Sequence, residues 1–204
     1  FQSEILFGLY NLKRKENVYS VGFGPNLKQG SVLRIDKDIM NEMYEGDEND
    51  FRLAYWFSDM VDPDNNSYTH MIKYMDVDDL DTKTEISKGY TYIMPVLRVS
   101  EVYLIAAECC PDPKVGRDYL NAVRSVRNVK NVADEVDLTT VIEQEFRREF
   151  LGEGQLFWLY KRKGKAEIIS GETQGKVVSM EERFYLFDLP QSERDYREEN
   201  GIGN

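Results

Sequence analysis

The sequence is poor in residues that bind transition metals. Its 204 residues include two cysteines, Cys109 and Cys110, and one histidine, His70. This set argues against a zinc site of the usual ligand spacing. Adjacent cysteines rarely bond to each other, because the backbone geometry strains such a bridge. We therefore expect two small buried hydrophobic residues rather than a redox pair, and neither a metal nor a cofactor.

Long apolar runs are also missing. No stretch approaches the roughly 20 apolar residues that span a bilayer. The first residue is Phe1 rather than Met, and the opening "SEILFGLY" already has the pattern of a strand. No secretion signal precedes it. We expect the chain to be one segment of a larger protein.

Basic residues are fewer than acidic ones. Lysine and arginine number 26 against 37 aspartates and glutamates, which gives a formal net charge of −11. Such a surface repels a phosphate backbone, so nucleic-acid binding is not expected. The hydrophobic share of 41% is that of an ordered globular protein, and a chain of this length buries roughly 70% of its unfolded surface.

Residues 1–95 have the composition and residue pattern typical of strands and loops. The segment 37–44 is a short helix candidate, and 17–30 is rich in glycine and asparagine. The runs "RLAYWF" (52–57) and "YTHMIKYM" (68–75) are typical of strands, and the turn-rich 58–67 lies between them. We predict neighbouring strands here and a solvated loop in the acidic "DVDDLD".

Residues 96–152 are predicted to be helical, and the rest of the segment 96–204 to be loop, short strand and tail. A helical pair is predicted over about 97–128, with a break at Pro111 and Pro113. A third helix begins near Thr140, with Glu143 completing a capping box, and stops at Gly152 or Gly154. The segment 183–190 is predicted as a last strand before a polar tail. The fold class is therefore mostly α, with irregular loops and a few short strands.

The third helix carries an unusual charge pattern. Glu145, Glu149 and Glu153 recur at intervals of four, so they share one face. A glycosidase would place two such carboxyls about 5 Å apart in an open cleft. A general acid, however, needs a raised pKa, and flanking arginines keep carboxylates ionised. We therefore favour a structural ion network over a solvated face or a catalytic pair, with these members: Arg98, Arg124, Arg127, Glu145, Arg148, Glu149 and Glu153.

Four motifs occur in a fixed order along residues 95–195. They are "RVSEVYLIAAE", "LNAVR", "EFRREFLGEG" and "LPQSE". This series resembles the C-terminal half of the SusD/RagB family of surface nutrient-binding lipoproteins of Bacteroidetes. Phe146 stands where the family pattern has its first arginine, and the tail after Glu193 lacks a common Asn-Pro-Gly-Tyr ending.

The resemblance implies a fold and a function. Family members contain tetratricopeptide-like helix pairs and are anchored at the outer-membrane surface through an N-terminal lipid, which this chain lacks. They bind glycans without catalysis and deliver them to a SusC-type TonB-dependent transporter. Two alternatives stay open: a tetratricopeptide-type scaffold that binds only protein partners, and a glycoside hydrolase.

Candidate glycan-binding residues come from the chain itself, since the family's ligand residues vary between members. Exposed aromatic rings beside amide groups suit sugars. We select Tyr19, Phe23 and Asn26 in the glycine-rich stretch, and Tyr55 and Trp56, which would point to opposite faces of a strand. Residues 1–95 would then face the ligand, and 96–204 would support them.

Two other motifs receive a structural interpretation. "DPDNNS" (62–67) has calcium-type ligands at its first positions but lacks the required Gly and Glu, so we predict an Asx turn. The aromatics of "LFWLYKR" (156–162) could stack on sugars, but their alternation with leucines favours core packing: Phe157, Trp158 and Tyr160.

Overall fold

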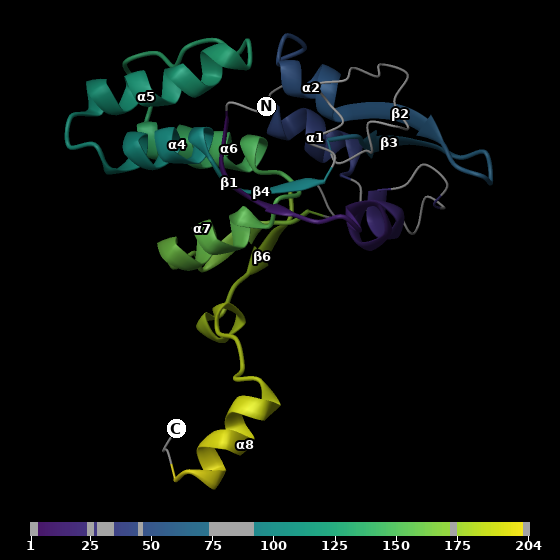
Figure 1. The fold of residues 1–204 in the computed structure, drawn as a ribbon. Helices are drawn as coiled ribbons and strands as arrows, with labels where there is room; N and C mark the ends of the chain where they lie inside the picture. Colours follow the sequence, from purple (N-terminus) through teal and green to yellow (C-terminus); the bar gives the residue numbers. More distant parts are fainter. Residues whose placement is uncertain are drawn as a thin grey trace.

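The computed structural model describes residues 4–23, 27, 35–44, 47–73, 92–171 and 175–201, apart from the side chains of Lys15 and Tyr19. The mostly α fold class is confirmed: helices dominate, and the strands of these ranges form three small antiparallel pairs (Figure 1). In chain order the elements are β1 (Ile5–Tyr10), the π-helix η2 (Lys15–Phe23), α1 (Lys37–Met43), α2 (Phe51–Trp56), β2 (Phe57–Val61), β3 (Ser67–Met71), β4 (Ile93–Arg98), α4 (Val99–Cys109), α5 (Pro113–Val126), α6 (Leu138–Glu149), α7 (Gln155–Lys163), β5 (Glu167–Ile169), β6 (Val177–Ser179), the 3-10 helix η5 (Glu182–Tyr185) and α8 (Gln191–Glu199).

The predicted helical pair is present as α4 and α5, which pack side by side (Figure 1). The side chain of Asp112 caps α5, and Pro113 occupies its first turn, where a missing N–H costs nothing. Gly116 permits the close approach, because a Cβ there would lie 2.8 Å from the carbonyl oxygen of Ala107. These helices pack with α6 and α7 in one hydrophobic cluster around the buried Leu104 and Leu120.

The first helix of the pair, α4, buries only some of its apolar side chains. Leu104 and Ala107 face the core, whereas Val102 and Ile105 are exposed. Leu97 belongs to β4 rather than to the helix. Cys109 is also exposed and Cys110 partly so, which corrects the expectation of two buried thiols: they lie where the chain leaves α4.

A second hydrophobic cluster lies on the strand-and-loop side of the molecule. It joins η2, α1, α2, β2 and β3 around these buried residues: Phe23, Met40, Tyr44, Trp56, Phe57 and Met71. The strand predicted at "RLAYWF" is wrong, because Asp50 caps a short helix, α2, and the strand starts only at Phe57. The expected strand pair exists as β2 and β3, in register from Phe57↔Met71 to Val61↔Ser67.

The turn between β2 and β3 has the predicted Asx chemistry. Asp62 Oδ1 accepts hydrogen bonds from the backbone N–H groups of Asp64 and Asn66, at 3.0 and 2.8 Å. Asn65 adopts a positive φ of 65° there, a conformation that asparagine tolerates. The acidic run 76–81 lies outside the described residues.

The start of the chain is tied to the helices. The predicted opening strand is β1, which pairs antiparallel with β4 immediately before α4.

The third helix, α6, begins at Leu138 under an Asp137 cap, so the predicted Thr140–Glu143 capping box is wrong. It ends at Glu149, earlier than the predicted glycine stop.

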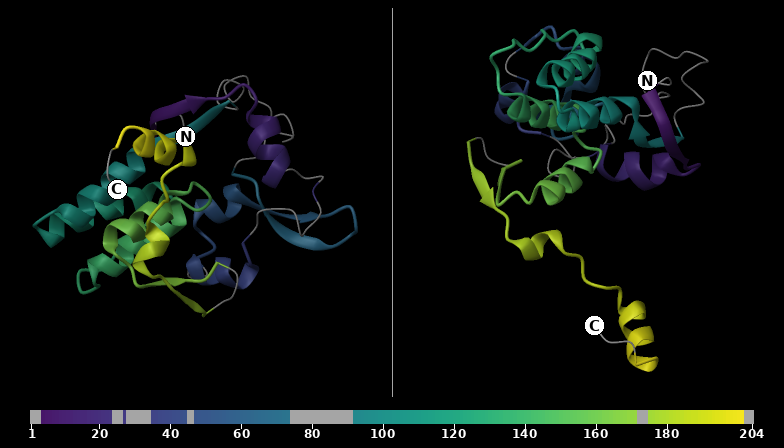
Figure 2. Two further views of the ribbon diagram at one scale, coloured as in Figure 1. Left: turned by 90° about the horizontal axis from the view of Figure 1, so that it is seen from below. Right: turned by 90° about the vertical axis from the view of Figure 1, so that its left-hand side faces the viewer.

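The last part of the chain leaves the body. Where a final strand was predicted, the structure has η5 followed by an unpaired stretch, and the polar tail forms α8. Figure 1 and the right-hand view of Figure 2 show this segment extending away from the helices. The strand prediction failed because a short run of aromatic and apolar residues also fits a segment without a strand partner. Helix α8 buries no residue.

Candidate functional site

Helix α6 presents carboxylates and arginines on its buried face. The Asp137 cap fixes where the helix begins, so Ile142, Glu145, Phe146 and Glu149 turn toward the interior. Glu145 and Glu149 have no exposed surface. Buried carboxylates are unfavourable unless ion pairs and hydrogen bonds replace water, so their partners decide what they can do.

Glu149 contacts three arginines. Its carboxylate lies 2.6 Å from Arg98 Nη1, 2.7 Å from Arg127 Nη2 and 3.2 Å from Arg52 Nη1. Burial by itself raises the pKa of Glu149, but the hydrogen bond from Arg127 and the charges of the arginines outweigh it. The pKa is held well below the ordinary carboxyl range.

Glu145 is the second centre of the network. Arg52 Nη1 lies 2.7 Å from its Oε1, while Arg124 and Arg148 approach Oε2 at 2.9 and 3.3 Å. Arg52 therefore bridges both buried glutamates, and it also pairs with Asp50 at 2.7 Å. A single connected ion network results.

Glu153 extends the network beyond the helix. It accepts hydrogen bonds from Arg98 Nη2 and Nε at 2.8 and 3.0 Å and from the Lys73 ammonium. That ammonium also lies 3.7 Å from the ring centroid of Trp56. Burial lowers the pKa of Lys73 to about 8, although the charge of Glu153 opposes the shift.

The structure pairs all seven residues that the sequence placed in the network and adds four that it missed. The ion network, as named from here on, consists of Glu4, Asp50, Arg52, Lys73, Arg98, Arg124, Arg127, Glu145, Arg148, Glu149 and Glu153. The missed members lie far from α6 in the chain, and no periodicity marks them. Among the missed members, only Asp50 has a local sequence signal, because an aspartate directly before a helix is a typical N-cap.

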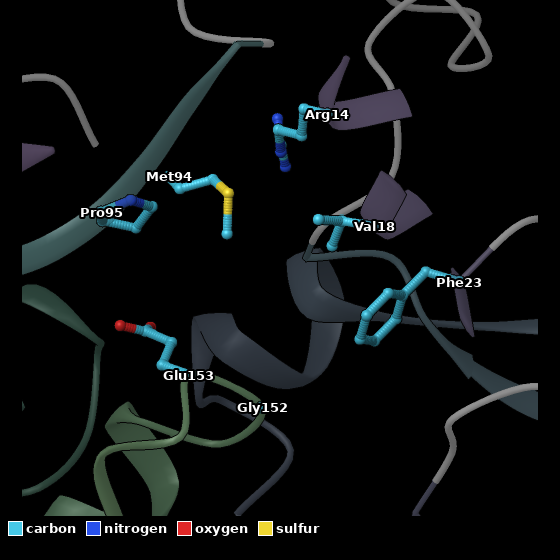
Figure 3. A pocket seen from close by; sticks show the side chains of 7 residues that line it. All are labelled: Arg14, Val18, Phe23, Met94, Pro95, Gly152 and Glu153. Atoms are coloured by element: carbon cyan, nitrogen blue, oxygen red, sulfur yellow. The ribbon is translucent and has the colours of Figure 1, made fainter. Parts of the chain in front are cut away.

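A small pocket adjoins the ion network. It lies between η2 with the residue before it, strand β4 and the loop after α6, and Figure 3 shows its lining side chains. Its volume is about 110 Å³. We call it the Phe23 pocket, and its lining residues are Arg14, Val18, Phe23, Met94, Pro95, Gly152 and Glu153.

The sequence-selected glycan residues have different surroundings. Tyr55 is 71% exposed, whereas Trp56 and Phe23 are buried at 8% and 7%. Phe23 is thus not the exposed loop aromatic that the sequence suggested, because η2 turns it into the second cluster and the pocket wall. The side chain of Tyr19 and all of Asn26 lie outside the described residues.

His70 supports the pocket wall from behind. It is fully buried on β3, and its Nε2 donates to the carbonyl oxygen of Phe23 at 2.7 Å. Burial lowers the pKa of His70, which keeps the ring neutral and suited to this single donation. The end of η2 is thereby fixed to the β2–β3 pair.

A comparison with protein-family models identifies the family. The model described as the SusD family matches residues 26–198. This chain belongs to the SusD family. Searches of curated proteins and of solved structures found no match.

SusD family membership implies glycan binding at the cell surface, by binding proteins rather than enzymes. The ion network suits that role. A glycosidase acid needs a carboxyl with a raised pKa, whereas the pKa of Glu149 is lowered. In the described ranges no helix has the length and apolar character of a membrane span.

The aromatic segment "LFWLYKR" (156–162) lies in α7. Tyr160 is buried and Phe157 partly so, as core packing requires, but Trp158 is 54% exposed. Its ring lies 5.8 Å from that of Phe187, also exposed, on the stretch leading to α8. The expectation of core packing therefore fails for Trp158, which lies on the outer side of α7.

Proposed function

We propose that this protein captures a glycan at the outer-membrane surface and delivers it to a SusC-type TonB-dependent transporter. The observation that carries the proposal is the match to the SusD family over residues 26–198. The charge arrangement on α6 supports binding without catalysis, since its carboxylates are held ionised by arginines. Attachment to the membrane would depend on a lipid anchor.

Residues 1–95 form the ligand-facing part in this proposal. Tyr55 offers an exposed ring, and Tyr19 and Asn26 flank Phe23 in the sequence. Phe23 and Trp56 contribute as the buried support beneath this surface. Residues 96–204 hold it in place through the ion network, and both parts together make one segment of a larger SusD-like domain.

Glycan binding is tested by titrating the purified chain with a panel of oligosaccharides and polysaccharides in a calorimeter. The variant Tyr55→Ala should weaken the binding about tenfold, because it removes an exposed stacking surface. Its melting temperature should stay within about 1 °C of the wild type, as for most surface substitutions. Unchanged affinity in Tyr55→Ala would remove Tyr55 from the site.

Delivery is tested separately, by co-expression with a SusC-type transporter encoded beside this protein. We expect the two proteins to copurify through one tagged partner. A glycan-binding chain that never copurifies with such a transporter would contradict delivery while leaving glycan binding in place.

A protein-binding scaffold is the second candidate function. The pair α4–α5 carries a groove of about 470 Å³ whose lining includes Val99 and the exposed Tyr103 and Val126. Helix pairs with such a face commonly bind another helix. Titration with the glycan panel separates the two candidates, since the scaffold function requires that no carbohydrate binds.

A further inference from the structure

The Phe23 pocket has room for a substituent rather than for a whole sugar. Its volume is about 110 Å³. A cavity of roughly 150 Å³ in another protein is filled by benzene, so this pocket fits a group of about four non-hydrogen atoms. A pyranose ring with its hydroxyl groups is too large and would remain at the mouth.

Most of the lining is apolar. Val18 and Phe23 come from η2, and Met94 and Pro95 come from β4. In Figure 3 the methyl end of Met94 points into the centre of the pocket. A hydroxyl group placed against these side chains would lose its water without gaining a partner, whereas a methyl group would gain favourable contact.

Two polar groups border this apolar lining. The Arg14 guanidinium points into the pocket from the η2 side, and Glu153 lines the side opposite Arg14, with its carboxylate turned toward Pro95 (Figure 3). A guanidinium only donates hydrogen bonds, so it suits a carbonyl oxygen. A carboxylate accepts hydrogen bonds at several positions, so Glu153 can take an amide N–H while it stays paired with Arg98 and Lys73.

One common sugar substituent combines a methyl group, a carbonyl and an N–H within about four non-hydrogen atoms, the size estimated for this pocket. We propose that the Phe23 pocket is the subsite for the acetamido group of an N-acetylated sugar. The methyl group contacts Met94, Val18 and Phe23, the carbonyl accepts from Arg14, and the N–H donates to Glu153. An anionic substituent fits less well, because Glu153 borders the same small space. This inference rests on the proposed glycan binding and names its substrate class.

The test compares two neutral β-1,4-linked disaccharides, N,N′-diacetylchitobiose and cellobiose, which differ at the acetamido positions. Calorimetric titration of the full chain should give at least about tenfold tighter binding of the acetylated one, the lower end of what a small buried group provides. Saturation-transfer NMR should place the strongest signal on the acetyl methyl protons. The Met94 methyl resonance should also shift on titration.

Matched variants locate the preference. Val18→Phe fills the pocket and should abolish the difference between the disaccharides, whereas Val21→Phe, at an exposed position of the same helix, should retain it. Arg14→Met should reduce the preference, and Lys13→Met next to it should not. A circular dichroism spectrum identical to the wild type shows that each variant is folded, and the Met94 shift tests the site in the wild-type chain if Val18→Phe does not fold.

Three results would overturn the inference. Equal affinity for the two disaccharides, while other glycans bind, would remove the acetamido subsite and leave the proposed function standing. Tighter binding of glucuronic-acid oligosaccharides than of diacetylchitobiose would mark an anionic subsite instead. Binding of no glycan at all would remove both the subsite and the proposed function.

Discussion

Glu149 has no exposed surface, and its carboxylate contacts three arginines of the ion network. The substitution Glu149→Ala leaves those guanidinium groups facing each other, so we expect it to lower the free energy of unfolding by about 3–5 kcal/mol. Glu143→Ala, on the same helix but at a partly exposed pair with Lys165, should cost about 1 kcal/mol or less. Denaturant unfolding followed by circular dichroism measures both, and equal effects would contradict a structural role specific to Glu149.

The acid stability of the protein depends on the same carboxylate. Because the folded-state pKa of Glu149 is lowered, its stabilisation is complete above the ordinary carboxyl pKa of 4.5 and is lost as the pH falls below it. The difference in unfolding free energy between wild type and Glu149→Gln should therefore shrink from pH 5 downward.

Lys73 adds a second pH dependence of stability, at alkaline pH. Burial lowers its pKa from 10.5 to about 8, so between these values the unfolded chain binds a proton that the folded chain does not. Stability from this group therefore rises with pH across that window, by at most about 3 kcal/mol. We expect the unfolding free energy of wild type, measured relative to Lys73→Met, to rise from pH 8 to pH 10. The tyrosines that also titrate there are common to both proteins, and a flat difference would show that Lys73 has an ordinary pKa when folded.

At the residue scale the sequence predicts partners only where spacing reveals them. Glu145, Glu149 and Glu153 share a helix face, and the motif arginines before them supplied plausible partners. Arg52 could not be found this way, since it lies 97 positions before Glu149 and no repeat links them. Phe23 and Trp56 were selected as candidate exposed aromatics, and only the tertiary fold decides that both are buried.

At the scale of elements, Gly116 sets the distance between α4 and α5. A Cβ would lie 2.8 Å from the backbone oxygen of Ala107 and 3.2 Å from Leu138, and the backbone contact cannot be relieved by rotating a side chain. We expect Gly116→Ala to destabilise the protein by about 1–3 kcal/mol, which exceeds the helix-propensity gain of about 1 kcal/mol. Ser125→Ala, at an exposed position of α5, should change stability by no more than about 0.5 kcal/mol. A more stable Gly116→Ala variant in thermal unfolding would show that α5 moves away freely.

Elements with strong caps and periodicity were predictable, and short ones were not. The helical pair and the β2–β3 turn follow from prolines, aspartates and apolar spacing. The six-residue α2 is rich in aromatic residues, as strands often are, and only its Asp50 cap and the Arg52–Asp50 ion pair favour a helix. The segment after η5 lacks a strand partner, which no local pattern can reveal.

At the scale of the whole molecule, the ion network joins the two hydrophobic clusters. Asp50 and Arg52 lie at the start of α2, which packs in the second hydrophobic cluster. Glu145 and Glu149 lie on α6, which packs in the first hydrophobic cluster, and Arg52 pairs with both of them. Glu4 brings in the start of the chain through Arg127, and Glu153 borders the Phe23 pocket. The charged helix therefore connects the supporting part of the molecule to the proposed ligand-facing part.

Binding without catalysis is the central claim, and one titration tests it most directly. The purified chain is titrated with the glycan panel in a calorimeter, and the same samples are assayed afterwards for released reducing ends. We predict saturable binding of at least one glycan with no release of reducing ends. Release that disappears in Glu145→Gln or Glu149→Gln, or a complete absence of carbohydrate binding, would contradict the claim.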